Sequence, residues 1–233
     1  ERIAAEKARL VKEGKIKKEK PLPPISEEEK LFRIPDSWCF CRLGDICDGI
    51  TSGSTPPKEK FSHDEGVPFL KVYNIRDQKI DFDYEPKFVE KDYNDSKLKR
   101  SMLYPGDVVM NIVGPPLGKV AIIPSNFPVW NCNQAIVFFR PIDMGLNKHI
   151  YTYLKAGLFL ASIELIGTAG QDNISVTKSR LIVLPMPPLK EQLRIADRIE
   201  QLLSLCDQLS ARLQASQTTQ LNLAEALVEG ALN

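Results

Sequence analysis

Short apolar runs separated by turn residues fill the middle of the chain. Four of them cover residues 67–72, 107–113, 118–123 and 134–139. Runs of four to eight residues bounded by Gly, Pro, Asn or Ser are typical of strands. This pattern predicts a sheet-rich domain.

One segment of this region has helical spacing instead. Its apolar residues share one face of a helix, after a possible cap at Asn147: Ile150, Leu154, Leu158, Ala161 and Leu165. Because strands dominate and helices lie beside them, we expect an α+β domain over residues 35–188.

The last part of the chain, residues 189–233, has a different pattern. After Pro188 there is no Gly or Pro until Gly230, and apolar residues follow a 4-3 spacing that only Ser216 and Gln220 interrupt. A sustained repeat near 3.5 predicts a coiled-coil helix that needs a partner helix, and we expect a homodimer in isolation. The predicted helix-pairing residues are Ile195, Ile199, Leu202, Cys206, Leu209, Leu213, Leu223 and Leu227.

Residues 1–34 form a third part. Residues 1–30 carry nine Lys or Arg and seven Asp or Glu, with a weak helical stripe that Gly14 ends. Pro21 to Pro24 then predict a stiff, extended linker. Because residue 1 is Glu and not Met, we expect that the chain starts inside a longer protein or has been cut.

Composition narrows the functional classes. The formal net charge of +1 means that any DNA binding must come from local patches. Five cysteines, an odd number, do not indicate a disulfide scaffold and favour a reducing cytoplasm. The best candidate for a membrane span, residues 156–167, is short and contains Glu164, which argues against a membrane protein.

Enzyme motifs are weak, so we expect no catalysis, no cofactor and no metal. The chain has neither G-x-G-x-x-G nor a P-loop, and residues 111–116 lack the aromatic residue of an amino-methyltransferase motif. A magnesium nuclease built from Asp36, Glu85 and Lys87 stays an alternative, disfavoured because Pro86 disrupts the strand that should present them. Cys39, Cys41 and Cys47 are too closely spaced for a structural zinc site.

Several ordered motifs resemble one known family. They are Ala8–Ile16, Lys20–Ile25, Ile34–Ile46, Leu103–Val109, Leu184–Ile195 and Leu205–Leu209. Together they resemble the specificity subunit of a type I restriction-modification system, and the match covers essentially the whole chain. Residues 1–34 are similar to the end of the central conserved helix, 35–188 to the second target recognition domain, and 189–233 to the C-terminal conserved helix.

The resemblance implies a division of labour. In that family each recognition domain reads one half of a bipartite DNA sequence, and the two conserved helices pack antiparallel as a spacer. Methylation and cleavage belong to partner methyltransferase and restriction subunits. The resemblance therefore implies a non-catalytic DNA-binding protein.

Polar loops between the strands supply candidate DNA contacts. Arg and Lys read guanine and Asn and Gln read adenine, whereas exposed basic runs suit phosphates. The candidates for bases are Lys71, Asn74 and Arg76; Asn131, Asn133 and Gln134; and Gln171, Asn173 and Lys178. Those for phosphates are Lys97, Lys99 and Arg100. A protein–protein adaptor with an oligomerising helix is the alternative function.

Overall fold

The computed structural model describes residues 1–62, 64–163 and 173–232. The chain divides into two units, residues 1–186, which we call the head, and residues 187–233. No helix in the described part is long and apolar enough to cross a membrane. All five cysteines are free thiols.

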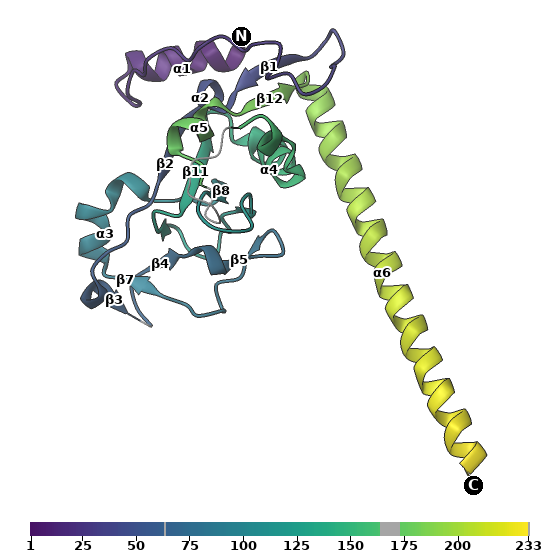
Figure 1. Cartoon of the computed structure of the whole chain (residues 1–233). Coiled ribbons are helices and arrows are strands. Elements are labelled where there is room, and N and C mark those ends of the chain that lie inside the picture. Colours follow the sequence, from purple (N-terminus) through teal and green to yellow (C-terminus); the bar gives the residue numbers. More distant parts are fainter. Residues whose placement is uncertain (63, 164–172, 233) are drawn as a thin grey trace. The chain divides into compact units, whose positions relative to one another are not determined.

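The head combines short helices with twelve strands in the described residues (Figure 1). Its α-helices are α1 (Arg2–Lys12), α2 (Leu43–Ile46), α3 (Lys91–Lys97), α4 (Asn147–Ala156) and α5 (Val176–Leu181). Its strands are β1 (Cys39–Arg42), β2 (Cys47–Ser52), β3 (Phe61–Ser62), β4 (Val67–Leu70), β5 (Ile75–Arg76), β6 (Lys79–Ile80), β7 (Phe88–Val89), β8 (Val108–Asn111), β9 (Val120–Ile122), β10 (Asn131–Cys132), β11 (Ile136–Pro141) and β12 (Val183–Met186). This mixture confirms the α+β class.

The central sheet has the strand order β2-β11-β8-β9, with every neighbouring pair antiparallel. Its side chains alternate between two buried faces: Val108 and Met110 of β8 join one core cluster, and Val109 between them joins another. The first cluster includes residues of α4, such as Ile150, and the second includes Trp130. Burial of both faces explains why the sequence shows continuous apolar runs.

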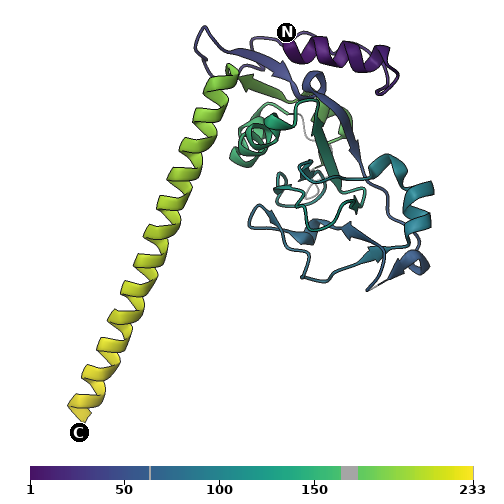
Figure 2. The ribbon, with the colours of Figure 1, turned by 180° about the vertical axis from the view of Figure 1, so that it is seen from behind.

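A second sheet has the order β10-β4-β7-β3. β10 runs parallel to β4, with Asn131 opposite Phe69 and Cys132 opposite Leu70, whereas β7 is antiparallel to β4. Two further pairs, β1 with β12 and β5 with β6, complete the strands of the described residues. Figure 2 shows the same arrangement from behind.

The mid-chain helix is shorter than the pattern predicted. α4 ends at Ala156 because Gly157 has a left-handed backbone conformation, with φ at 72°. Leu158 and Ala161 follow in a 3-10 turn, where Phe159 is the buried residue. The predicted helical position Leu165 lies outside the described residues.

The N-terminal segment packs against the rest of the head. α1 ends before Gly14, as predicted, and the Lys7 ammonium donates to the carbonyl oxygens of Gly44 and Cys47. The charged helix is thereby tied to the region around α2.

Arg42 holds the proline-rich linker. The residue is 2% exposed, and its guanidinium donates to the carbonyl oxygens of Pro23, Pro24 and Leu181 at 2.7–3.0 Å and pairs with both carboxylate oxygens of Glu29. These hydrogen bonds lower the pKa of Glu29. One buried cation therefore joins the linker to the C-terminal end of α5.

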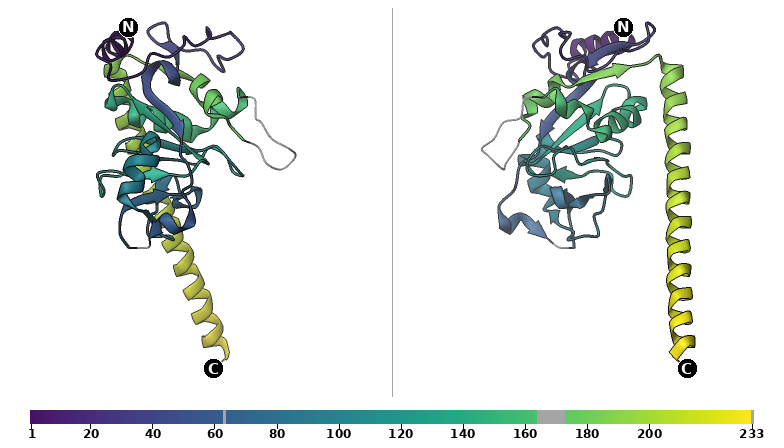
Figure 3. Two further views of the ribbon diagram at one scale, coloured as in Figure 1. Left: turned by 90° about the vertical axis from the view of Figure 1, so that its left-hand side faces the viewer. Right: turned by 45° about the vertical axis from the view of Figure 1, so that its right-hand side comes forward.

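The second unit consists of α6 (Leu189–Leu232), a single unbroken helix (Figure 3). This confirms the long C-terminal helix that the sequence predicted. Its leucines are exposed within this chain, Leu209 at 55% and Leu213 at 62%. Such an apolar stripe needs a partner to be buried.

Candidate nucleic-acid interface

Two parallel strands end side by side and bring separate loops together. β4 ends at Leu70 and β10 ends at Cys132, and the Asn133 amide donates to the Leu70 carbonyl oxygen at 3.0 Å. Since parallel strands carry the chain out of a sheet at the same edge, Lys71 and Asn133 leave it as neighbours. Two of the three predicted polar clusters therefore meet here.

Asn74 was predicted to contact a base, but in the structure its side chain is buried and has a structural role. The side chain is 1% exposed. Its oxygen accepts from the Lys71 amide at 2.9 Å, and its nitrogen donates to the carbonyl oxygens of Asp81 and Tyr84. Asn74 therefore fixes the loop that carries its neighbours and does not reach a base.

Asn131 is likewise internal and is corrected in the same way. Its side chain is fully buried and donates to the Asn94 side-chain oxygen at 2.7 Å and to the Leu98 carbonyl oxygen at 3.1 Å. It also accepts from the Cys132 amide. This amide joins β10 to α3, so it has no free group with which to read DNA.

Lys71 lies among aromatic rings and beside a second lysine. Its ammonium is 5.5 Å from the Phe61 ring centroid and 5.8 Å from that of Tyr73. Burial and the neighbouring charge of Lys87 lower the pKa of Lys71. Lys87 lies on the adjacent chain segment, where its carbonyl oxygen accepts from the Phe69 amide at 2.8 Å. Among the described residues no carboxylate lies within ion-pair distance of either ammonium, and the Glu85 carboxylate only partly offsets their repulsion, so a bound anion would relieve the rest.

Arg76 stands on the β5–β6 hairpin, stacked on an aromatic side chain. Its guanidinium carbon is 4.4 Å from the Tyr84 ring centroid, and its Nε is 3.3 Å from Asp81 Oδ2. The Tyr84 ring meets the Tyr73 ring edge-on at 5.9 Å. Because the ion pair is solvent-exposed, it is worth at most about 1 kcal/mol and is easily exchanged for another acceptor.

A hollow of about 500 Å³ opens beside this hairpin. Its lining mixes aromatic, cationic and amide groups with one carboxylate and two apolar residues: Tyr73, Ile75, Arg76, Asp77, Gln78, Tyr84, Pro116 and Lys119. Tyrosine faces and forked donors of this kind suit the edges and sugars of nucleotides.

The loop after β10 is braced by the loop after β2. A Cβ on Gly53 would lie 1.8 Å from the Cys132 carbonyl oxygen, so only glycine permits this approach of the two backbones. The Thr55 hydroxyl contacts the side-chain oxygen of Gln134, and Gln134 is exposed. The loop after β2, through Gly53 and Thr55, thus supports Gln134, one of the predicted base contacts.

The third predicted cluster is only partly described. Gln171 lies outside the described residues. Asn173 forms an isolated bridge with Val113, and the Ile112 backbone is bonded to both Ala135 and Ile174. Asn173 therefore borders the β10 loop.

Neither Lys178 nor the basic run 97–100 lies at the ends of β4 and β10. Lys178 belongs to α5, which lies near α2 and away from β4 and β5 (Figure 1). Lys97, Lys99 and Arg100 are exposed at the end of α3, which Figures 1 and 2 show on the opposite side from β5. Lys97, Lys99 and Arg100 form a basic segment of their own.

We call the gathered side chains the strand-end rim. Its members are exposed or half-buried: Lys71, Arg76, Tyr84, Lys87, Asn133 and Gln134. The sequence did not single out Tyr84, and it placed Lys87 only in the alternative nuclease site. The long-range pairing of β7 with β4 brings Lys87 to the rim, and the hydrogen bond from the Asn74 side chain to the Tyr84 carbonyl oxygen holds Tyr84 there.

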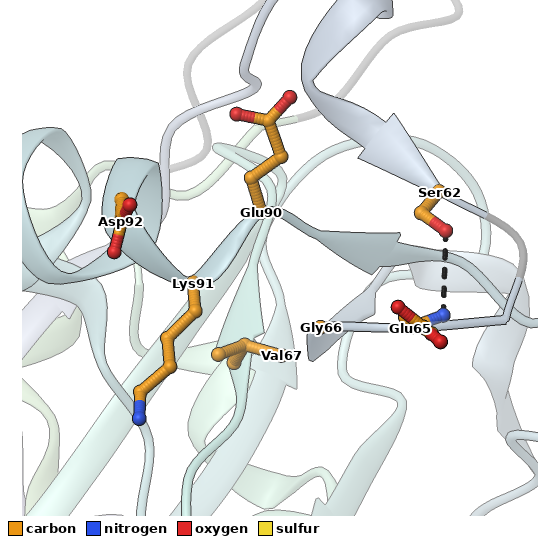
Figure 4. A pocket seen from close by; sticks show the side chains of 7 residues that line it. All are labelled: Ser62, Glu65, Gly66, Val67, Glu90, Lys91 and Asp92. Carbon is orange, nitrogen blue, oxygen red and sulfur yellow. Dashed lines mark hydrogen bonds between the residues drawn. The ribbon is translucent and has the colours of Figure 1, made fainter.

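An acidic hollow of about 690 Å³ lies elsewhere on the head (Figure 4). It is lined by Ser62, Glu65, Gly66, Val67, Glu90, Lys91 and Asp92. Three carboxylates against one lysine disfavour the approach of phosphate. Within residues 1–62, 64–163 and 173–232, no three His, Cys, Asp or Glu side chains gather as they would around a metal ion.

Comparison with known proteins assigns the fold and the family. Solved structures with this fold include the HsdS subunit from Thermoanaerobacter tengcongensis, 20% identical with a TM-score of 0.53 over 75% of this chain and 39% of that one. A chain from a study of complex assembly and conformational transition in the type I R-M system is 20% identical, with a TM-score of 0.59 over 91% of this chain and 49% of that one.

Curated relatives are more similar in sequence. The specificity subunits of the Escherichia coli type I restriction enzymes EcoEI and EcoAI are 33% and 34% identical over the whole of this chain. The chain spans 40% and 39% of their respective lengths. The model of the type I restriction modification DNA specificity domain matches residues 35–216. The chain therefore belongs to the family of type I restriction-modification specificity proteins.

Proposed function

We propose that the head recognises a short half-site in duplex DNA, as the C-terminal half of a specificity subunit without catalytic activity of its own. The observation that carries this proposal is the strand-end rim, where hydrogen-bond donors and an aromatic ring from three chain segments, 71–76, 84–87 and 133–134, converge. A length near two-fifths of the curated relatives fits one half of such a subunit.

The rim separates two kinds of contact. Lys71, which the sequence predicted as a base contact, is reassigned in this proposal to phosphate together with Lys87, because the two ammonium groups repel each other and no carboxylate among the described residues forms an ion pair with either. Arg76 and Gln134 carry forked groups that suit base edges, Arg for guanine and Gln for adenine. Asn133 and Asn173 are further base candidates, and Lys97, Lys99 and Arg100 are further phosphate candidates. Each correctly read base pair then contributes about 1–3 kcal/mol.

The long helix supplies spacing and assembly. We propose that α6 pairs with a conserved helix of the same system, and with a second α6 when the chain is isolated. A second recognition domain would then read a half-site about one duplex turn away, at roughly 34–36 Å. The methyltransferase and restriction subunits are the proposed protein partners. Five free thiols agree with a cytoplasmic location.

Selection from random duplexes tests this function. The chain is incubated with a duplex pool, alone and with its methyltransferase subunit, and the retained DNA is sequenced. We expect one short motif to be enriched in at least the second arm. If neither arm enriches any motif while both proteins are folded, DNA recognition is rejected and the adaptor function takes its place.

A further inference from the structure

We propose that Gln78 is a positioning residue that holds the β5–β6 hairpin as a fixed reading arm against the edge of the central sheet. The inference rests on the proposed function, since it assumes that Arg76 on this hairpin reads a base. It adds the residue that determines where Arg76 is presented.

The hairpin has an unfavourable turn that needs external support. Asp77 and Gln78 form its two-residue tip with φ values of 48° and 60°, and they join Arg76 to its cross-strand neighbour Lys79. Turns of this geometry favour Asn-Gly, because side chains such as Gln rarely adopt positive φ. A two-stranded hairpin is also only marginally stable by itself.

Gln78 provides that support through both its side chain and its backbone. Its side-chain oxygen accepts from the Val120 amide at 2.7 Å, and Val120 begins β9, the edge strand of the central sheet. The Tyr151 hydroxyl of α4 donates to the Gln78 carbonyl oxygen at 3.0 Å. Ile80, opposite Ile75 in the hairpin, packs partly buried against the core. The tip is therefore tied to a strand and a helix that belong to the rigid part of the head.

This attachment fixes the arginine two residues away. Arg76 directly precedes the anchored tip and pairs with Lys79 across the hairpin. Its guanidinium carbon lies 4.4 Å from the Tyr84 ring centroid. Bidentate recognition of a base requires the guanidinium in one place and one plane, so anchoring the hairpin lowers the cost of ordering it on DNA. Loss of the anchor is expected to weaken the preference for one base pair without removing general DNA affinity.

Binding measurements on single variants test the inference, using the motif selected by the wild-type chain. Arg76→Ala first identifies the base pair whose preference depends on the arginine. We then expect Gln78→Ala to reduce the preference at that same base pair about tenfold, with the affinity for non-specific DNA and the midpoint of urea unfolding nearly unchanged. Tyr151→Phe removes the hydrogen bond to the Gln78 carbonyl oxygen and should also reduce the preference at this base pair.

Two matched variants separate positioning from general damage. Gln78→Glu keeps an acceptor for the Val120 amide, so it should keep the base preference even where its charge lowers overall affinity. Lys79→Ala, next to the tip, should also keep the preference.

The outcomes are distinct. The inference is overturned if Gln78→Ala keeps the wild-type preference within twofold, if it lowers the preference at all base pairs together with stability, or if Arg76→Ala changes no preference. In these cases DNA reading still stands. A wild-type chain that prefers no sequence removes the proposed function as well.

Discussion

The guanidinium of Arg140 forms a bidentate ion pair with the buried carboxylate of Asp107, with Nε–Oδ1 at 2.9 Å and Nη2–Oδ2 at 2.6 Å. Asp107 is 1% exposed, and its Oδ2 also accepts from the Tyr104 amide. The rings of Tyr104 and Phe138 lie 4.6 and 5.0 Å from the Arg140 guanidinium carbon. This pair fixes the turn before β8 onto β11, within the Leu103–Val109 motif that the sequence singled out.

Arg140→Met should destabilise the head strongly. The substitution leaves the Asp107 carboxylate buried without its cation, which costs roughly 3 kcal/mol. Burial already raises the pKa of Asp107, and Arg140 counteracts that rise. Urea unfolding checks the loss. The double variant Arg140→Met/Asp107→Asn should lose less than the single one, and an equal or larger loss would contradict the account of a charge left unpaired.

His149 should make stability depend on pH. Its Nε2 lies 2.8 Å from the Pro185 carbonyl oxygen of β12, and burial lowers the pKa of His149 below its usual 6.5. The unfolded chain therefore takes up a proton at a higher pH than the folded one. Stability is complete above about pH 6.5 and decreases as the pH falls towards the lower folded pKa.

His149→Gln isolates this effect, since the Gln amide can still donate to Pro185 but does not titrate. Unfolding free energies at pH 7.5 and 5.0 should differ less in the variant than in the wild type. An identical pH dependence in both proteins would show that His149 is protonated in the folded state as easily as in the unfolded one.

Lys71 and Lys87 should contribute to the salt dependence of DNA binding and not to its sequence preference. A phosphate contact releases counterions, so each Lys→Ala change should reduce the slope of log Kobs against log salt by about 0.9. Titrations at several salt concentrations measure the slope. Lys91→Ala in the acidic hollow is the control and should leave it unchanged. A changed base preference in Lys71→Ala would assign this lysine to a base instead.

The exposed stripe of α6 should pair two isolated chains. Leu209→Asp/Leu213→Asp places charges on the predicted seam and should convert a dimer into a monomer, as measured by light scattering at tens of micromolar. Ala211→Asp/Ala215→Asp adds the same charge on other faces of the helix and should leave the dimer intact. A monomeric wild-type chain would reject pairing through this helix.

The local hydrophobic pattern predicted the strands that are buried along most of their length and the helix with a regular apolar repeat. The four predicted apolar runs contain β4, β8 and β9 and the first four residues of β11, because each of these strands is buried on both faces or in a core cluster. The absence of Gly and Pro together with the 4-3 repeat predicted α6. Gly157 was the available signal that α4 ends before the apolar pattern does.

The interface was less predictable, because its members depend on long-range pairing. In the sequence, Asn74 and Asn131 resembled exposed loop residues. Only the tertiary structure shows that their side-chain amides are hydrogen-bonded to backbone groups and to Asn94. Lys87 joins Lys71 through the pairing of β7 with β4, which no local pattern predicts. Arg76 and Gln134, in contrast, remain exposed as expected.

The most direct test compares motifs selected from random duplexes by three proteins: the wild type, Arg76→Ala/Gln134→Ala on the strand-end rim, and Lys97→Ala/Lys99→Ala/Arg100→Ala at the end of α3. The account predicts that the rim variant loses base preference at part of the motif, whereas the α3 variant binds more weakly but selects the wild-type motif. An unchanged motif in the rim variant, with preference lost in the α3 variant, would contradict it.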